Sequence, residues 1–176
     1  MKKIILILSI FTMIGCAKKT TTVNIEPKLT LNKSIIIKSN INLDVNDLRE
    51  RNKSYVNFGN DLKKETYNTV ANAYRLNISS EQKNNKLNTL SLNILQLGFN
   101  QKQETVTVES NLICEISVDV QTAKTNYKNK YIYKNTYNTI TEPSISDKNT
   151  YINTIFDKCL NKALNDPKIY EVLNQN

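Results

Sequence analysis

The sequence predicts an α+β domain of two layers, with helices packed on one face of a mainly antiparallel sheet. Runs of alternating apolar and polar residues are interrupted by stretches with helical spacing, in the order strand, loop, helix, strand, strand, helix. The two consecutive strands flank a short polar break, which is typical of a β-hairpin. The chain has 176 residues, so one hydrophobic core can still form after an export signal is removed.

The first long strand is predicted over 34–48. Ile41, Leu43 and Val45 alternate there with asparagine and aspartate, so one side of the strand is expected to be buried. The next stretch, 49–80, is polar and has no sustained period. We expect it to be a long loop with a short helix near Leu62–Ala73.

A helix is predicted over 80–97. Its apolar residues fall at positions i, i+3, i+7 and i+10, which form one stripe on a helix: Leu87, Leu90, Ile94 and Leu97. Gly98 follows this stripe, as a C-terminal capping residue does.

The hairpin is predicted from two alternating runs, 105–122 and 127–140, around a polar turn. In the second run the tyrosines share one face, and the opposite face holds Lys128, Lys130, Ile132 and Lys134. A second helix is expected from Ser146 onward. Asp166-Pro167 then breaks it and begins a short terminal helix.

The N-terminus has the pattern of an export signal. Lys2 and Lys3 precede a run of about ten apolar residues, which is too short for a permanent membrane span. Met13-Ile14-Gly15-Cys16 resembles a lipobox, in which a small residue precedes a cysteine that becomes the lipidated N-terminus. An ordinary signal peptide cleaved elsewhere and a permanent transmembrane helix are the alternatives.

This interpretation divides the chain into a lipoprotein signal peptide at 1–15, a lipidated N-terminus and tether at 16–33, and one periplasmic domain at 34–176. Diacylglycerol and an N-acyl chain on Cys16 would be the covalent lipids, and two or three chains anchor stably in a bilayer. Ala17 follows the cysteine in place of an aspartate. By resemblance to enterobacterial sorting rules, this favours the outer membrane.

The charge of the chain leaves two explanations open. The formal net charge is +8, and removal of Lys2 and Lys3 leaves +6, from 22 basic and 16 acidic residues. Codon drift in an AT-rich genome explains this excess, and so does attraction to anionic lipid or polysaccharide. Nucleic acid is not expected as a partner of an exported domain.

Nothing in the sequence supports an enzyme, a cofactor or a metal site. The chain has no histidine and three glycines, so the commonest general base and a glycine-rich phosphate loop are both missing. The carboxylates Asp44, Asp47 and Glu50 lie near two arginines, with which we expect them to pair in solvent. An enzyme acting on an envelope polymer is the weakest of the alternatives.

Three further groups of residues are candidates for modification or binding. Cys114 and Cys159 either form a disulfide in an oxidising compartment or remain as two buried thiols. The row of Lys128, Lys130 and Lys134 is either a solvated strand face or a contact for an anionic glycolipid or peptidoglycan. Asn52, in Glu50-Arg51-Asn52-Lys53-Ser54, fits the acceptor pattern of bacterial N-glycosylation.

The layout resembles the YajG-like family of bacterial outer-membrane lipoproteins. The similar parts are the lipobox, Val45-x-Asp47-x-Arg49, Leu97-Gly98-Phe99 and Ala163-Leu164-Asn165-Asp166-Pro167. The resemblance implies a periplasm-facing lipoprotein without an established catalytic activity. We therefore expect a binding or accessory role in the cell envelope, with an envelope protein, glycan or glycolipid as partner. The alternative is a subunit or partner of a larger envelope machine, such as lipopolysaccharide assembly or the flagellar motor.

Overall fold

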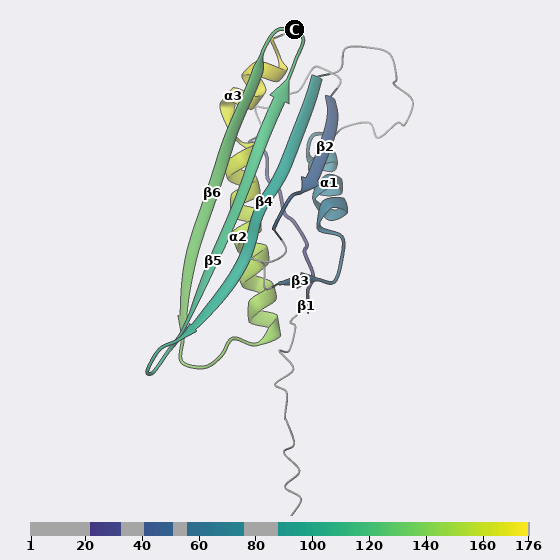
Figure 1. The fold of residues 1–176 in the computed structure, drawn as a ribbon. Coiled ribbons are helices and arrows are strands. Elements are labelled where there is room, and N and C mark those ends of the chain that lie inside the picture. The colour runs from purple at the N-terminus through teal and green to yellow at the C-terminus, as the bar shows by residue number, and fades with distance from the viewer. Residues whose placement is uncertain (1–21, 33–40, 51–55, 76–87, 176) are drawn as a thin grey trace, which may run out of the picture.

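The computed structural model describes residues 22–32, 41–50, 56–75 and 88–175 (Figure 1). The elements are β1 (Thr22–Val23), β2 (Ile41–Asp47), β3 (Asn57–Phe58), α1 (Leu62–Ala73), β4 (Asn88–Gln103), β5 (Val108–Gln121), β6 (Asn126–Thr139), α2 (Ile145–Leu164) and α3 (Pro167–Leu173). Residues 1–21, 33–40, 51–55, 76–87 and 176 lie outside this description.

The larger sheet has four strands in the order β2-β4-β5-β6. β4, β5 and β6 are antiparallel neighbours, whereas β2 lies parallel to β4, from which α1 separates it along the chain. α2 runs along the inner face of β5 and β6, and α1 packs on β2 (Figure 1). The predicted α+β class, with a mainly antiparallel sheet and helices on one face, is confirmed.

One hydrophobic core lies between the sheet and the helices. The inward side chains of the strands include Val45, Leu92 and Val118, which the register places side by side on neighbouring strands. α2 contributes Phe156 and Leu160, both fully buried. The predicted hairpin is confirmed as β5 and β6, and its tyrosines face the helices as expected.

The prediction of a helix over 80–97 is wrong for the residues that the structure describes, because 88–103 form β4. Leu90, Leu92 and Ile94 are buried at a period of two, and the register then shifts between Ile94 and Gln96. This β-bulge inserts one residue, so that Leu97 faces the core again. The bulge accounts for the three-residue spacing between Ile94 and Leu97, which contributed to the helical pattern.

The three helices begin with side-chain caps. Asp61 accepts from the backbone N–H of Lys64 at the start of α1, which confirms the short helix expected at Leu62–Ala73. Ser144 and Asp147 form a capping box at the start of α2. Asp166 caps α3 with proline at its first turn, as predicted.

The predicted tether, 16–33, needs correction over 22–32, which packs onto the domain as an extended segment between β1 and residue 32. Asparagine and aspartate side chains along α2 accept hydrogen bonds from every second backbone N–H of this segment. The pairs, from segment to helix, are Asn24–Asn149, Glu26–Asn153, Lys28–Asp157, Thr30–Asn161 and Asn32–Asn165, at 2.7–3.3 Å. We call this set the amide ladder.

The amide ladder works because two repeats match. Four residues of α-helix rise about 6 Å, and two residues of extended chain advance about 6.6 Å. Three of the helix asparagines also donate to segment carbonyls: Asn153 to Asn24, Asn161 to Lys28 and Asn165 to Thr30. On the segment's other edge Asn60 bonds both backbone groups of Ile25, whose side chain is buried. The segment is thus held like a strand, with side-chain amides replacing a neighbouring backbone.

Cys114 of β5 and Cys159 of α2 are both fully buried and free in the structure. The Cys159 thiol lies 3.7 Å from the carbonyl oxygen of Tyr131. Burial, followed by a hydrogen bond with Cys159, raises the pKa of the Cys114 thiol well above its ordinary value. The two thiols therefore contact each other across the sheet–helix interface as neutral groups of the core.

Replacing Asp157 with asparagine should stabilise the fold. The Asp157 carboxylate can accept a hydrogen bond in the amide ladder but, unlike the asparagine side chains, cannot donate one. The repeat places its second oxygen opposite the Glu26 carbonyl, where an amide would donate. We expect Asp157→Asn to add about 1 kcal/mol and to raise the melting temperature by roughly 2–4 °C at neutral pH. Asp157→Ala, which removes the acceptor for Lys28, should lower it.

The pH dependence supplies the control for this substitution. Burial raises the pKa of the Asp157 carboxyl, against a smaller lowering by the Lys28 N–H and charge. A raised pKa in the folded state means that stability is lost as pH rises from the unfolded pKa of about 3.9 through the folded value. The advantage of Asp157→Asn in thermal melts should therefore be small at acid pH and grow toward neutrality. An advantage that does not change with pH would contradict this account.

The two core thiols should be reduced and protected in the folded protein. Because both are buried and the Cys114 pKa is raised, alkylation should be slow in native conditions and should modify both thiols in denaturant. Intact mass spectrometry of a Cys16→Ser variant should show no mass change on reduction. A gain of two hydrogens on reduction would show that the pair forms a disulfide.

Candidate functional site

The polar residues of the described chain lie mainly on the surface of the domain. No group of three or more histidine, cysteine, aspartate or glutamate residues in the described ranges could hold a metal ion. Among the same residues, no helix combines the length and apolar character needed to cross a bilayer. The candidate sites are surfaces that carry ordered polar or exposed apolar side chains.

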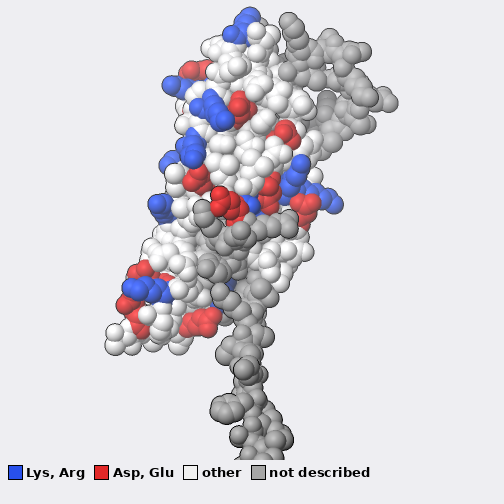
Figure 2. All heavy atoms as spheres, in the orientation of Figure 1, with Lys and Arg blue, Asp and Glu red and all other residues white. Residues whose placement is uncertain are grey.

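The first surface is the outer face of the four-stranded sheet, which none of the three described helices covers; we call it the open face. Lys128, Lys130 and Lys134 lie exposed on this face of β6, as the alternation predicts. Lys130 pairs with Glu115 of β5 at 2.7 Å, and Lys128 is opposite Asp119 in the register. Figure 2 shows basic and acidic side chains interleaved over the surface. The three lysines thus belong to a mixed-charge face.

A row of hydrogen-bonded polar side chains crosses the centre of the open face. Asn46 of β2 donates to Asp44 at 2.8 Å and to Asn93 of β4 at 3.2 Å. Asn93 in turn donates to the hydroxyl of Ser117 on β5 at 3.4 Å. These contacts order the amides and hydroxyls that this face presents.

Arg49 occupies a second polar site just after β2. Its guanidinium makes two hydrogen bonds of 2.8 Å to the carboxylate of Asp47 and lies 4.3 Å from the ring centroid of Phe58. This ion pair is the arginine partner that the sequence led us to expect for Asp47. A hollow of about 470 Å³ adjoins the pair and is also lined by Asp61, the cap of α1. Two carboxylates beside one arginine make the site unfavourable for an anionic ligand.

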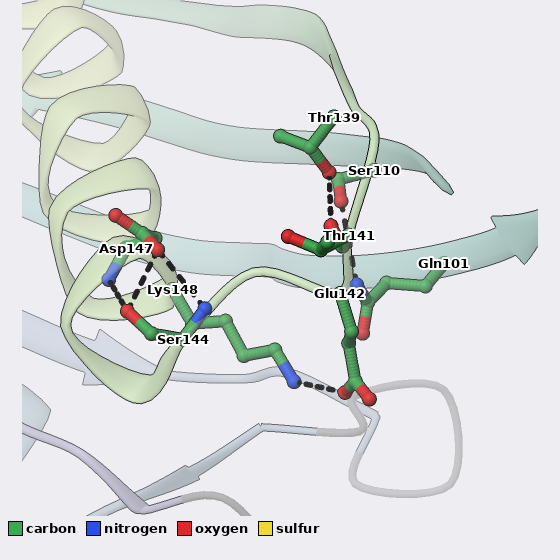
Figure 3. Close-up of polar contacts among 8 residues, drawn as sticks. All are labelled: Gln101, Ser110, Thr139, Thr141, Glu142, Ser144, Asp147 and Lys148. Atoms are coloured by element: carbon green, nitrogen blue, oxygen red, sulfur yellow. Dashed lines mark hydrogen bonds and ion pairs between the residues drawn. The ribbon is translucent and has the colours of Figure 1, made fainter. Parts of the chain in front are cut away.

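The third surface is the end of the domain where β6 leads into α2 (Figure 3). Lys148 of α2 donates to Glu142 at 2.7 Å, which lowers the pKa of that carboxyl. The Thr139 hydroxyl donates to the carbonyl of Thr141 at 2.7 Å, and Ser144 bonds Asp147 through both its N–H and its hydroxyl. These contacts fix the connection between β6 and α2.

This connection presents apolar side chains to solvent, together with the neighbouring β4–β5 turn. Ile140 and Ile145 flank the connection, and Val106 lies in the turn, where the Glu104 N–H donates to the Thr107 carbonyl at 2.8 Å. Val108 of β5 pairs with Thr139 of β6, so turn and connection lie at the same end of the sheet. We call this surface the connection end.

Two predicted site residues, Cys16 and Asn52, lie outside the described residues. The sequence interpretation missed the amide ladder and the connection end. The ladder had a signal, since asparagine or aspartate recurs at every fourth position from Asn149 to Asn165. A second signal was the apolar alternation of Val23 and Ile25 with Leu29 and Leu31. The connection end had none, because single exposed apolar residues are common in loops.

The comparisons with known proteins place the fold and the family. Protein XCC0632 from Xanthomonas campestris, described as a DUF330 protein, has a crystal structure that aligns with a TM-score of 0.51 at 7% identity, over 87% of this chain and 94% of that one. A second crystal structure, of an uncharacterized protein, aligns with a TM-score of 0.48 at 7% identity, over 82% of this chain and 96% of that one. No curated protein matches the sequence. At such identity, the likeness to XCC0632 supports a shared fold alone.

A family model described as "uncharacterized lipoprotein" matches residues 27–174. The match begins within the segment that the amide ladder holds and ends within one residue of the end of α3. It agrees with the resemblance drawn from the lipobox and the short motifs. The chain therefore belongs to this YajG-like family of lipoproteins.

Proposed function

We propose that this protein is a non-catalytic lipoprotein of the bacterial cell envelope, held by lipid on Cys16 in the outer membrane and facing the periplasm. Its role would be to present the open face to an envelope partner. The observation that carries the proposal is the short distance along the chain between the lipobox cysteine and Thr22, the first described residue, which belongs to β1 and pairs with β3.

The length of this connection limits how far the domain can stand from the membrane. Six residue steps separate Cys16 from Thr22 in the sequence, and an extended chain spans at most about 20 Å over that number. A tether that continued to residue 33 would allow about 60 Å. The amide ladder thus supports a domain that works next to the bilayer.

The character of the open face favours a polar partner. Its ordered amides and hydroxyls, and its interleaved charges, can make hydrogen bonds and ion pairs with a glycan, a glycolipid headgroup or a protein. A protein partner within a larger envelope machine is favoured by a separate feature. β6 is an edge strand of 14 residues, and such an edge can accept an added strand. Crosslinking in intact cells distinguishes a glycan or glycolipid partner from a protein partner in a larger machine, since only the protein partner would be recovered in stoichiometric amount.

Substitution of Cys16 by serine should abolish membrane attachment. Without the thiol no diacylglycerol can be attached, and the domain has no other covalent lipid site in this interpretation. Palmitate labelling should be lost, and the protein should move from the membrane pellet to the soluble fraction. The thermal melt of the domain should be unchanged, because the amide ladder begins after Cys16. Labelling or membrane partition equal to wild type would overturn the proposed anchor.

The lysine row should contribute to binding of an anionic partner. We expect replacement of Lys128, Lys130 and Lys134 by glutamine to weaken binding to isolated sacculi or to vesicles containing phosphatidylglycerol several-fold, and to reduce its salt dependence. The matched control removes three exposed lysines elsewhere, at Lys63, Lys64 and Lys168. Equal binding by the wild type and both variants would remove the lysine row from the site.

A further inference from the structure

We propose that the connection end touches the lipid surface itself, with Val106, Ile140 and Ile145 entering the interface between headgroups and acyl chains. This contact rests on the proposed anchor at Cys16. It would fix the orientation of the domain on the membrane, which the anchor at Cys16 by itself does not determine.

The exposed apolar side chains are concentrated at this end. In the described part of the chain five large hydrophobic residues are exposed: Ile140 at 81%, Val106 at 72%, Leu48 at 58%, Ile145 at 55% and Ile132 at 41%. The three at the connection end include the two most exposed. Because Val106 and Ile140 lie just beyond paired strand ends, and Ile145 begins α2, they face solvent from one pole of the molecule.

The lipid anchor reaches the domain at the same pole. The amide ladder runs in one direction, from Asn24 opposite Asn149 in the first turns of α2 to Asn32 opposite Asn165 at its end. The chain that arrives from Cys16 therefore enters beside Ile145 and runs away from it. With at most about 20 Å between Cys16 and Thr22, the connection end lies within reach of the bilayer surface.

The charges at the connection end favour an apolar contact over an electrostatic one. The two lysines there are already paired, Lys102 with Glu104 at 2.6 Å and Lys148 with Glu142 at 2.7 Å. No unpaired lysine or arginine is found among the described residues of this end, so it offers no basic cluster for anionic lipid. Apolar side chains on a fixed scaffold can enter a zwitterionic interface without such a cluster.

The internal contacts of the connection end reduce the conformational entropy that would be lost on insertion. The capping box, the Thr139–Thr141 contact and the Lys148–Glu142 pair already hold the residues between Ile140 and Ile145 (Figure 3). A loop whose backbone is held before binding loses less freedom when its side chains enter the membrane. The surface is therefore preorganised for a planar partner.

The test is a site-by-site measurement of lipid contact on the full mature lipoprotein. Single cysteines at Val106→Cys, Ile140→Cys and Ile145→Cys carry an environment-sensitive fluorophore, and the protein is reconstituted on phosphatidylcholine vesicles. The native core thiols should not label, because both are buried. Ile132→Cys on the open face and Leu48→Cys after β2 are matched controls, since both replace exposed apolar residues away from the connection end.

We expect at least a two-fold rise in emission, and quenching by spin-labelled lipid, at the three connection-end positions and at neither control. Flotation of the same samples reports the anchor independently. If the protein floats with the vesicles but all five positions stay equally accessible to water, the contact is overturned and the anchor stands. If the protein does not float, both fail. A signal that requires phosphatidylglycerol would overturn the apolar contact in favour of an electrostatic one.

Discussion

The pairing of α2 with the extended N-terminal segment is the interaction on which the rest of the arrangement depends. It links residues more than 120 positions apart, such as Asn24 and Asn149, and it closes one edge of the helical layer. It does so without a neighbouring strand, because side-chain amides supply both the acceptor and the donor that a backbone would offer. The match between four helical residues and two extended ones keeps the pairing in step over five repeats.

In the proposed arrangement, the same pairing also sets how the fold is connected to the membrane. A lipid anchor restricts the position of the domain only when the chain that connects the two is short. The proposed connection from Cys16 to Thr22 has six residue steps. The direction of the amide ladder would then decide which pole of the domain a lipid anchor on Cys16 approaches. The open face then lies along the side of the domain, and α3 and the β5–β6 turn lie at the opposite pole (Figure 1).

The two faces of the sheet differ in their surroundings. Its inner face packs on α2, where the Cys159 thiol lies 3.7 Å from the backbone carbonyl oxygen of Tyr131. Its outer face carries hydrogen-bonded amides and paired charges. The bulge between Ile94 and Gln96 lets one long strand keep its apolar residues inward along its whole length.

The sequence by itself determined the fold class, the hairpin, the short helix at Leu62–Ala73 and the Asp166-Pro167 start of the terminal helix, because each depends on neighbouring residues and local periodicity. It did not determine β4, because a bulge gives alternating residues the spacing of a helix, and only pairing with β2 and β5 decides between them. Tertiary structure also decided that residues 22–32 pack along α2, and that Val106, Ile140 and Ile145 lie at one end of the domain. The recurrence of asparagine or aspartate at every fourth position along α2 is a sequence signal for the first, but only the folded structure shows which distant backbone those side chains bind. The second depends on how separate loops meet at one end of the sheet, which local periodicity does not record.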